Sequence, residues 1–352
     1  FQAGPSNLHS LKRSVAMPEK PDPPLVAVLG ATASGKHGLA LALAREFPVE
    51  IVSVDSMKVY RGMDIGTAKP SPERRRDPLH HMIDLANPDE SYTAARFGRE
   101  ARTVIEGIRV RGRIPLLVGG SGLYLRAVLG WIFPGPEADP ALRDRLRLEA
   151  EAGGVERLHR RLSGVDPETA AEVGMRDLKR IVRALEVYER TGVPISRLRT
   201  EHARRDSPFP DPLLLFLRWR REALYDRIDG RVRSMMRAGW MAEVRGLREK
   251  GYSPDLPAFR ALGYATLWRV LEGGMGLEEA AVTIQRETRR FAKRQMVWFR
   301  GMPGIQWVDV PDSGWRGCVS VVSGRIAECL ARRGGDLSRK KISSSSASEK
   351  EW

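Results

Sequence analysis

Short, mostly apolar runs that end at or precede a glycine or an acidic residue divide the first part of the chain. Residues 25–30 (LVAVLG), 51–54 (IVSV) and 114–118 (IPLLV) form such runs, and Asp55 and Gly119 follow the last two. Runs of this length and composition are typical of strands buried on both faces of a parallel sheet. The segment 38–47 between the first two runs has helix-forming composition. We therefore predict strands alternating with helices, with ligands bound where the strands end.

The pattern changes between residues 137 and 212, where charged helical segments occur without a buried-strand run. Residues 213–217 (LLLFL) then predict a strand that returns to the sheet. We expect a catalytic core made of residues 25–136 and 213–333, interrupted by an inserted helical subdomain at 137–212. The two ends, 1–24 and 334–352, are poor in apolar residues, so we expect them to be disordered.

Residues 222–300 predict several amphipathic helices. In one of them, six residues recur at three- and four-residue spacing and form an inward stripe: Ala281, Ile284, Thr288, Phe291, Gln295 and Trp298. Its other face carries a basic patch of four residues, which could line a phosphate channel or contact an RNA backbone: Arg289, Arg290, Lys293 and Arg294.

Charge and cysteine content narrow the functional classes. The formal net charge of +15 favours a polyanionic partner, either a nucleic acid or a phosphorylated substrate. The two cysteines, Cys318 and Cys329, are too few for a disulfide framework or a four-ligand zinc site, which favours a reducing compartment. No run approaches the roughly 20 apolar residues of a membrane span. We expect a cytoplasmic protein, without a membrane partner and monomeric.

A glycine-rich loop joins the first strand to the first helix. Its seven residues fit G-x-x-x-x-G-K: Gly30, Ala31, Thr32, Ala33, Ser34, Gly35 and Lys36. Backbone N–H groups in such a loop surround phosphate oxygens, and the helix dipole and the lysine add positive potential. The loop therefore predicts a phosphate site.

His37 departs from that motif, because Ser or Thr normally stands there and offers a hydroxyl to Mg²⁺. Imidazole is a poor ligand for this hard cation. His37 could face solvent, hydrogen-bond a phosphate, or, with an unperturbed pKa of about 6.5, carry a proton that neutralises phosphate charge. A weakened or inactive enzyme is a further alternative.

Longer motifs carry a resemblance to one family. The run at 55–70 reads DSMKVYRGMDIGTAKP, followed by HHMID at 80–84, PLLVGGSGLY at 115–124, DPALR at 139–143 and TRRFAKRQ at 288–295, with WFR at 298–300. In sequence and order these resemble the motifs of bacterial tRNA dimethylallyltransferases over about residues 25–307. The resemblance implies a P-loop NTPase-like parallel sheet flanked by helices, with an inserted helical tRNA-binding subdomain.

The resemblance also implies the reaction. Such an enzyme displaces diphosphate from dimethylallyl diphosphate with the exocyclic N6 of an adenosine beside the anticodon of tRNA, and uses Mg²⁺. The adenine must leave the base stack to react. By this resemblance the catalytic residues are Asp55 as general base, Ser121 as a hydrogen-bond partner of the substrate, and Lys36 and Arg289 on the diphosphate.

The same resemblance implies further contacts. The loop amides and His37 would lie at the diphosphate. The tRNA-binding residues would come from two regions: first Asp55, Ser56, Met57, Lys58 and Ser121, and then, in the inserted helices, Arg143, Lys179, Arg180, Ile181, Val182 and Arg183. A charged helix face is otherwise usually just solvated.

Some positions depart from the family pattern. Lys58 replaces a glutamine that could pair with an adenine edge through both a donor and an acceptor, whereas lysine only donates. Ser121 replaces a threonine and keeps the hydroxyl, and Val297 also replaces a threonine.

Three alternatives stay open. A small-molecule kinase would use the same loop but needs the missing Mg²⁺ hydroxyl. An enzyme that prenylates free AMP, ADP or ATP would not need the basic helices. A non-catalytic RNA-binding relative would account for His37 and Lys58 together.

Overall fold

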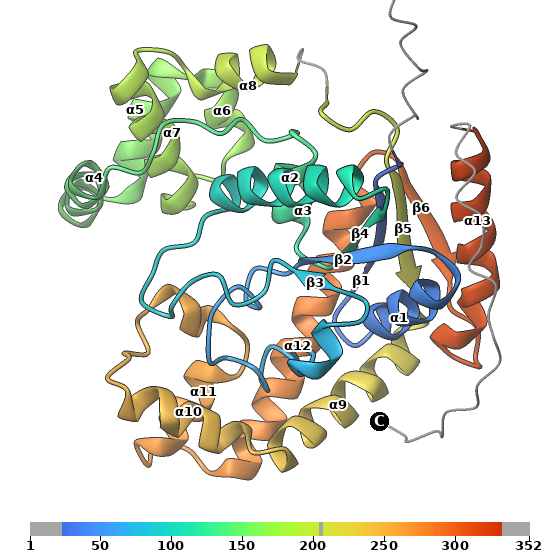
Figure 1. The fold of residues 1–352 in the computed structure, drawn as a ribbon. Coiled ribbons are helices and arrows are strands. Elements are labelled where there is room, and N and C mark those ends of the chain that lie inside the picture. Colours follow the sequence, from blue (N-terminus) through green and yellow to red (C-terminus); the bar gives the residue numbers. More distant parts are fainter. Residues whose placement is uncertain (1–22, 204–206, 333–352) are drawn as a thin grey trace, which may run out of the picture.

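A single parallel sheet of six strands forms the centre of the protein in the computed structural model, which describes residues 23–203 and 207–332. The strand order is β3-β2-β4-β1-β5-β6 (Figure 1). The bounds are β1 Val26–Gly30, β2 Val49–Val54, β3 His80–His81, β4 Ile114–Gly119, β5 Leu213–Arg218 and β6 Ile305–Asp309. The predicted parallel α/β fold is confirmed. The sequence analysis missed the edge strands, because β3 is only two residues long and β6 is half polar.

Residues alternate between the two faces of the sheet. In β1, Ala27 and Leu29 belong to one core, whereas Val26 and Val28 belong to the other. Both faces are covered by helices, which explains why the central strands are mostly apolar; Glu50 and Ser53 in β2 are buried polar exceptions. Helices α1 (Lys36–Glu46) and α13 (Val319–Arg332) cover one face, and α2 (Ala94–Val110) and α3 (Gly122–Val128) cover the other. Because the strands are parallel, the loops that follow β1, β2 and β4 meet at one edge of the sheet.

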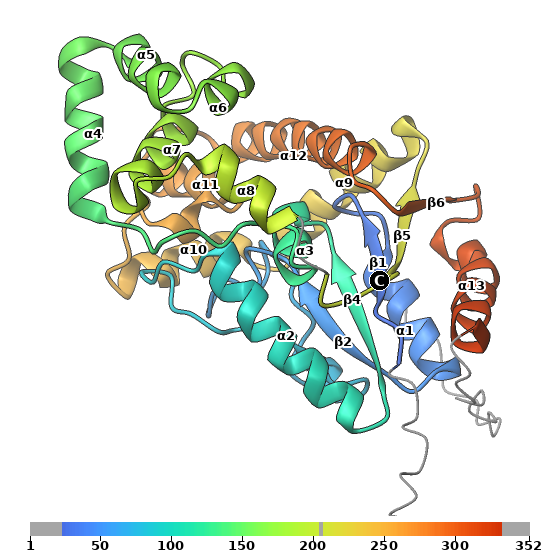
Figure 2. The same ribbon diagram turned by 90° about the horizontal axis from the view of Figure 1, so that it is seen from above.

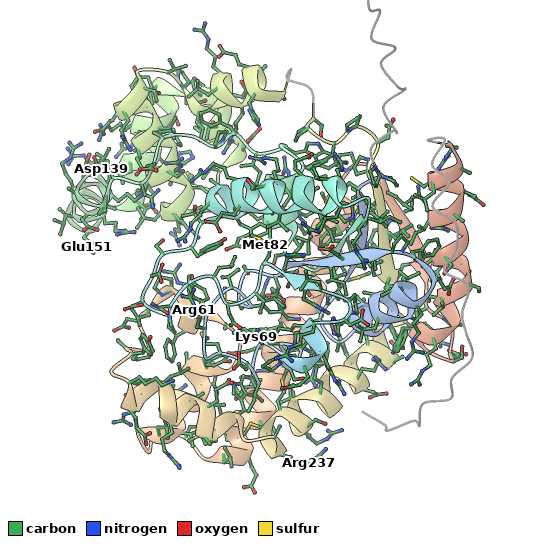
Figure 3. All side chains as sticks on the ribbon, in the orientation of Figure 1. Arg61, Lys69, Met82, Asp139, Glu151 and Arg237 are labelled. Atoms are coloured by element: carbon green, nitrogen blue, oxygen red, sulfur yellow. The ribbon has the colours of Figure 1, made fainter. Side chains whose placement is uncertain are left out.

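Five helices form a separate group, here called the helical lobe, with a core of its own. They are α4 (Pro140–Gly153), α5 (Val155–Val165), α6 (Pro167–Glu172), α7 (Leu178–Thr191) and α8 (Ile195–Ala203). Aspartates begin three of them: the side chains of Asp139, Asp166 and Asp177 accept hydrogen bonds from backbone N–H groups of the first turn. The lobe extends from the side of the sheet opposite α13 (Figures 1 and 2), and Asp139 and Glu151 mark it in Figure 3. The predicted subdomain boundaries stay a prediction.

A second set of helices follows β5: α9 (Arg221–Arg237), α10 (Trp240–Glu249), α11 (Tyr264–Leu271) and α12 (Leu277–Arg300). Helix α12 packs in turn against α9, α11 and α3. Its buried residues are Ala280, Ile284, Ala292, Gln295 and Phe299. The predicted inward stripe is wrong at its far end, because Trp298 keeps 41% of its surface exposed and Phe299 is buried instead. A helix with several neighbours along its length does not bury one straight stripe.

Short 3-10 helices complete the chain at Glu73–Arg75, Pro257–Arg260 and Trp315–Cys318. Within the described residues, no helix is both long and apolar enough to span a membrane. The predicted disorder of 334–352 and of nearly all of 1–24 lies outside the described residues.

Candidate active site

The glycine-rich loop has the strand–turn–helix geometry that phosphate binding requires. β1 ends at Gly30 and α1 begins at Lys36, with Ala33 and Gly35 in the left-handed region at φ 62° and 82°. A side chain at Gly35 would meet the Trp315 ring at 2.4 Å, so glycine is needed there for space as well as for conformation. The Lys36 ammonium donates to the carbonyl of Ala31 at 3.1 Å, which curls its side chain back over the loop. These features form a cradle of backbone N–H groups around a lysine.

Side chains from distant elements fix this loop. Thr32 N–H donates to the Oε1 atom of Gln295 on α12 at 2.9 Å, and Gln295 Nε2 donates to the carbonyl of Gly120 at 2.9 Å. Arg227 Nε donates to the carbonyl of Ala33 at 2.9 Å. Gln295 therefore bridges the loop after β1 and the loop after β4. The sequence analysis placed it in the inward stripe and in the TRRFAKRQ motif without a role at the loop, although a glutamine in such a stripe is itself a signal that buried polar groups need a partner.

Asp55 follows β2 at the same edge of the sheet and lies among cations. Its Oδ1 atom accepts the Met57 N–H at 2.9 Å, which fixes the carboxylate. The charges of Lys36, Lys58 and Arg231 all act at this position. Burial, then Arg231 and Lys58, lowers the pKa of Lys36 to about 7, while Asp55 opposes the shift. Burial likewise lowers the pKa of Lys58 to about 8. The site is a carboxylate facing three crowded cations, an arrangement suited to a multiply charged anion.

Arg231, on α9, was missed by the sequence analysis. It is four residues beyond Arg227, so both side chains leave the helix on one face, beside the buried Ile228. Two arginines one helical turn apart, beside a buried apolar residue, were the sequence signal that could have pointed to Arg231. Burial lowers the pKa of Arg231, and Asp55 opposes that shift.

Ser121 links the loops that follow β2 and β4. Its hydroxyl accepts the N–H of Ser56 at 3.0 Å and lies 3.3 Å from the Ser56 hydroxyl. The Ser121 N–H donates to the carbonyl of Val54 at 3.3 Å. The hydroxyl therefore stands directly beside the Asp55–Ser56 turn, within the region where the substrate role was predicted.

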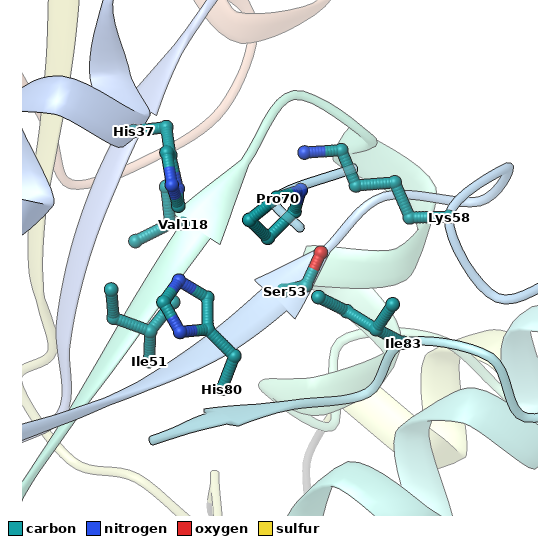
Figure 4. A pocket seen from close by; sticks show the side chains of 8 residues that line it. All are labelled: His37, Ile51, Ser53, Lys58, Pro70, His80, Ile83 and Val118. Carbon is teal, nitrogen blue, oxygen red and sulfur yellow. The ribbon is translucent and has the colours of Figure 1, made fainter. Parts of the chain in front are cut away.

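His37 points into a small pocket beside the phosphate cradle (Figure 4). Its ring lies 5.2 Å from that of His80, and Lys58 and Ser53 line the same pocket. Burial, together with Lys58 and His80, lowers the pKa of His37 to about 3. His37 is therefore a neutral imidazole near neutral pH in this structure, and its role as a proton-bearing group stays a prediction. His80 Nδ1 donates to the carbonyl of Pro78 at 2.7 Å, which leaves its Nε2 as a bare acceptor.

The long loop after β2 is held by a carboxylate. Three successive N–H groups, of Asp64, Ile65 and Gly66, donate to the carboxylate of Glu243 on α10 at 2.7, 2.7 and 3.2 Å. Lys69, labelled in Figure 3, donates to Asp64 at 2.8 Å within the same loop. The backbone of Asp64–Gly66 thus forms a nest that anchors the loop carrying Asp55 to the helices that follow β5. Glu243 stood outside the recognised motifs and was not predicted.

Arg289 does not lie free in the cradle. Its Nη1 donates to both carboxylate oxygens of Asp229, at 2.6 and 2.7 Å, and its guanidinium lies 5.9 Å from the Tyr225 ring. This ion pair neutralises much of its charge. Its predicted role at the diphosphate stays a prediction.

In the helical lobe, the predicted RNA-binding residues are of three kinds: exposed, hydrogen-bonded to a buried carboxylate, or buried. Lys179 and Arg180 are exposed at the start of α7. Arg143 and Arg183 instead bond the buried carboxylate of Glu186, Arg143 through two N–H groups at 2.8 Å each and Arg183 at 2.6 Å.

Ile181 and Val182 do not fit the prediction of RNA contact. Their side chains are 0% and 4% exposed in the core of the lobe, so they offer no surface to RNA.

The basic face of α12 is exposed as predicted at three of its positions, Arg290, Lys293 and Arg294. Lys293 and Arg294 line a shallow hollow together with Val297 and Trp298. A cationic rim around an exposed indole is a surface that RNA bases and phosphates can contact.

Comparisons with known proteins agree on one family. The sequence model of IPP transferase matches residues 58–302. The chain is 48% identical over 289 residues to tRNA dimethylallyltransferase 2 of Geotalea uraniireducens, which covers 82% of this chain and 93% of that protein. It resembles the crystal structure of the tRNA isopentenylpyrophosphate transferase of Bacillus halodurans, with a TM-score of 0.66 and 38% identity. The match covers 88% of this chain and 98% of that one. It also resembles a eukaryotic dimethylallyltransferase acting on tRNA, with a TM-score of 0.74 and 27% identity. The match covers 88% of this chain and 79% of that one.

Proposed function

The chain belongs to the IPP transferase family, and we propose that it transfers the dimethylallyl group of dimethylallyl diphosphate to N6 of the adenosine that follows the anticodon in tRNA. The observation that carries this proposal is the position of Asp55 beside the phosphate cradle, among Lys36, Lys58 and Arg231. A carboxylate next to a cationic cradle can take a proton from a nucleophile while the cations stabilise a leaving anion.

The reaction needs two charges to be handled at once. The lone pair of N6 attacks C1 of the dimethylallyl group, the C1–O bond breaks, and its electron pair leaves with diphosphate. N6 loses one proton, which Asp55 accepts. The hydrogen bond from Met57 N–H holds the carboxylate in place, so Asp55 is pre-organised as the base. The Ser121 hydroxyl, tied to Ser56, fixes the loop against which the adenine would lie.

The departing diphosphate gains negative charge, and the N–H groups and cationic side chains of the cradle stabilise that charge. Arg231 lies close enough to Lys36 for its charge to lower the pKa of that lysine. We propose Arg231 as the arginine that neutralises diphosphate, because Arg289 is occupied by Asp229. The Gln295 bridge supports the loop from behind.

On the RNA side, we propose that Lys179 and Arg180 of α7 and the basic face of α12 contact tRNA phosphates. Arg143 and Arg183 are better explained as structural partners of Glu186. Because the site is formed within one chain, we propose a monomer that works in the cytoplasm.

Magnesium is the part of the expected chemistry that these residues fit poorly. His37 brings a buried nitrogen where a hydroxyl oxygen is expected, and Mg²⁺ prefers oxygen ligands. The Ser34 hydroxyl is turned into the loop toward Gly30, and the Ser121 hydroxyl is engaged with Ser56. Mg²⁺ is therefore supplied in the assay only as a companion of the diphosphate.

The test is transfer from labelled dimethylallyl diphosphate to unmodified tRNA in the presence of Mg²⁺, followed by nucleoside analysis. We expect label in N6-dimethylallyladenosine from tRNA and none on AMP, ADP or ATP given in its place. The Asp55→Asn protein, which keeps the side-chain shape, is the matched negative control. Label on free AMP with none on tRNA would overturn the tRNA assignment, and phosphate transfer from ATP would indicate a kinase.

A further inference from the structure

The pocket beside the phosphate cradle contains two departures from the family pattern, His37 and Lys58, and they face each other. Figure 4 shows the Lys58 side chain passing Pro70 with its ammonium end turned toward His37. The two residues come from different elements, the first turn of α1 and the turn after β2. The fold brings them together, because they are not neighbours in the sequence.

His37 removes an oxygen ligand from the place where the cradle meets α1. Its imidazole lies against Ile51, Val118 and His80, and its Nε2 atom is buried without a hydrogen-bond partner among the described residues. A divalent cation placed there would meet a nitrogen ligand and the repulsion of three cations. The donor set at this position is thus unsuited to Mg²⁺.

Lys58 places a positive charge in the same space. Across residues 23–203 and 207–332, no side chain or carbonyl accepts a hydrogen bond from its ammonium, and no carboxylate pairs with it at ion-pair distance. It feels the charges of Asp55, Arg231 and Lys69, and burial lowers its pKa to about 8. An ammonium held without a partner beside Lys36 and Arg231 is relieved by an anion with several negative oxygens.

From this geometry we infer that Lys58 binds the diphosphate of the substrate in place of the cation-binding hydroxyl that His37 removes, so that diphosphate binding depends little on a divalent cation. Lys58 and His37 are then a coupled pair: one loses a metal ligand and the other supplies the missing positive charge. The inference rests on the proposed function, because it concerns the leaving group of that reaction. It assigns Lys58 to the diphosphate and not to the adenine edge.

The experiment measures binding of inorganic diphosphate to the full chain by titration calorimetry, once with EDTA and once with Mg²⁺. We expect the native protein to bind with similar affinity in both conditions. Lys58→Gln, which restores the family residue, should lose about 10- to 100-fold in affinity in EDTA, the loss expected for one charge-assisted hydrogen bond to the anion. Lys58→Arg keeps the charge and should retain metal-independent binding.

The double variant His37→Thr with Lys58→Gln restores both family residues. We expect it to bind diphosphate well only with Mg²⁺, which would exchange one cation for the other. Arg286→Gln, at an exposed position of α12, controls for the loss of one positive charge. Thermal melting of each variant checks that the fold is kept.

Three results would overturn the inference: native protein that binds diphosphate only with Mg²⁺, unchanged affinity of Lys58→Gln in EDTA, or a loss in Lys58→Gln confined to an anticodon stem-loop RNA. The last would assign Lys58 to base recognition. Failure of the proposed function is seen separately, because it would abolish dimethylallyl transfer to tRNA in Mg²⁺ while leaving the diphosphate titrations as they are.

Discussion

Replacing Gln295 by leucine tests whether the bridge from α12 holds the phosphate cradle in its binding geometry. Gln295 is 8% exposed, accepts the Thr32 N–H and donates to the Gly120 carbonyl. Leucine has a similar volume and fills the space, so no large cavity results. It leaves both backbone groups without a partner. An unsatisfied buried polar group costs about 1–3 kcal/mol. Because the Thr32 N–H is only partly buried, water can replace its partner. We therefore expect the free energy of unfolding of the variant to fall by about 2–4 kcal/mol in total.

The loop then has to be ordered by the ligand, which weakens binding. Of that total, about 1 kcal/mol falls on Thr32, which corresponds to about 5-fold faster amide exchange of the loop, and the affinity for diphosphate falls by no more than that factor. Hydrogen exchange read by mass spectrometry on peptides covering 30–36, together with diphosphate titration, measures both quantities. The matched control is Arg286→Gln, exposed on the same helix. If the Leu variant exchanged and bound as the native protein does, the bridge would not position the loop.

Other predictions concern the base, the cations and the lobe. Asp55→Asn should keep its affinity for an anticodon stem-loop RNA but lose most turnover in single-turnover assays; normal turnover would exclude Asp55 as the base. If Lys58 binds diphosphate, the anion should raise the pKa of Lys58 above about 8, so the affinity advantage of native protein over Lys58→Gln should be full below pH 8 and shrink as the pH rises further. Calorimetry at several pH values measures this, and a ratio independent of pH would contradict it. Glu186→Gln leaves Arg143 and Arg183 without their carboxylate and should destabilise the lobe by about 2–4 kcal/mol, less than a fully buried pair because both arginines keep about a third of their surface exposed. Denaturant unfolding of the lobe, monitored by amide hydrogen exchange in α4–α7, checks the value. An unchanged denaturation midpoint would show that water replaces the carboxylate.

The sequence by itself determined the parts of this protein that depend on local chemistry. Mostly apolar runs specify β1, β2, β4 and β5, because strands covered on both faces have little room for polar side chains. The G-x-x-x-x-G-K loop specifies its own conformation, since glycine at position 35 adopts the positive φ at no steric cost. Asp55 directly follows the apolar run of β2 in the sequence, and this places it at the edge of the sheet where the strands end.

Tertiary structure alone decided which distant residues complete the site. Arg231 and Gln295 lie 195 or more residues beyond Lys36, and their roles come from how α9 and α12 pack on the sheet, which no local pattern encodes. Packing also separated exposed Lys179 and Arg180 from buried Ile181 and Val182 within one helix, and it exposed Trp298 while burying Phe299. The fate of a side chain on a helix depends on the number and direction of its neighbours, and these are set by the whole fold.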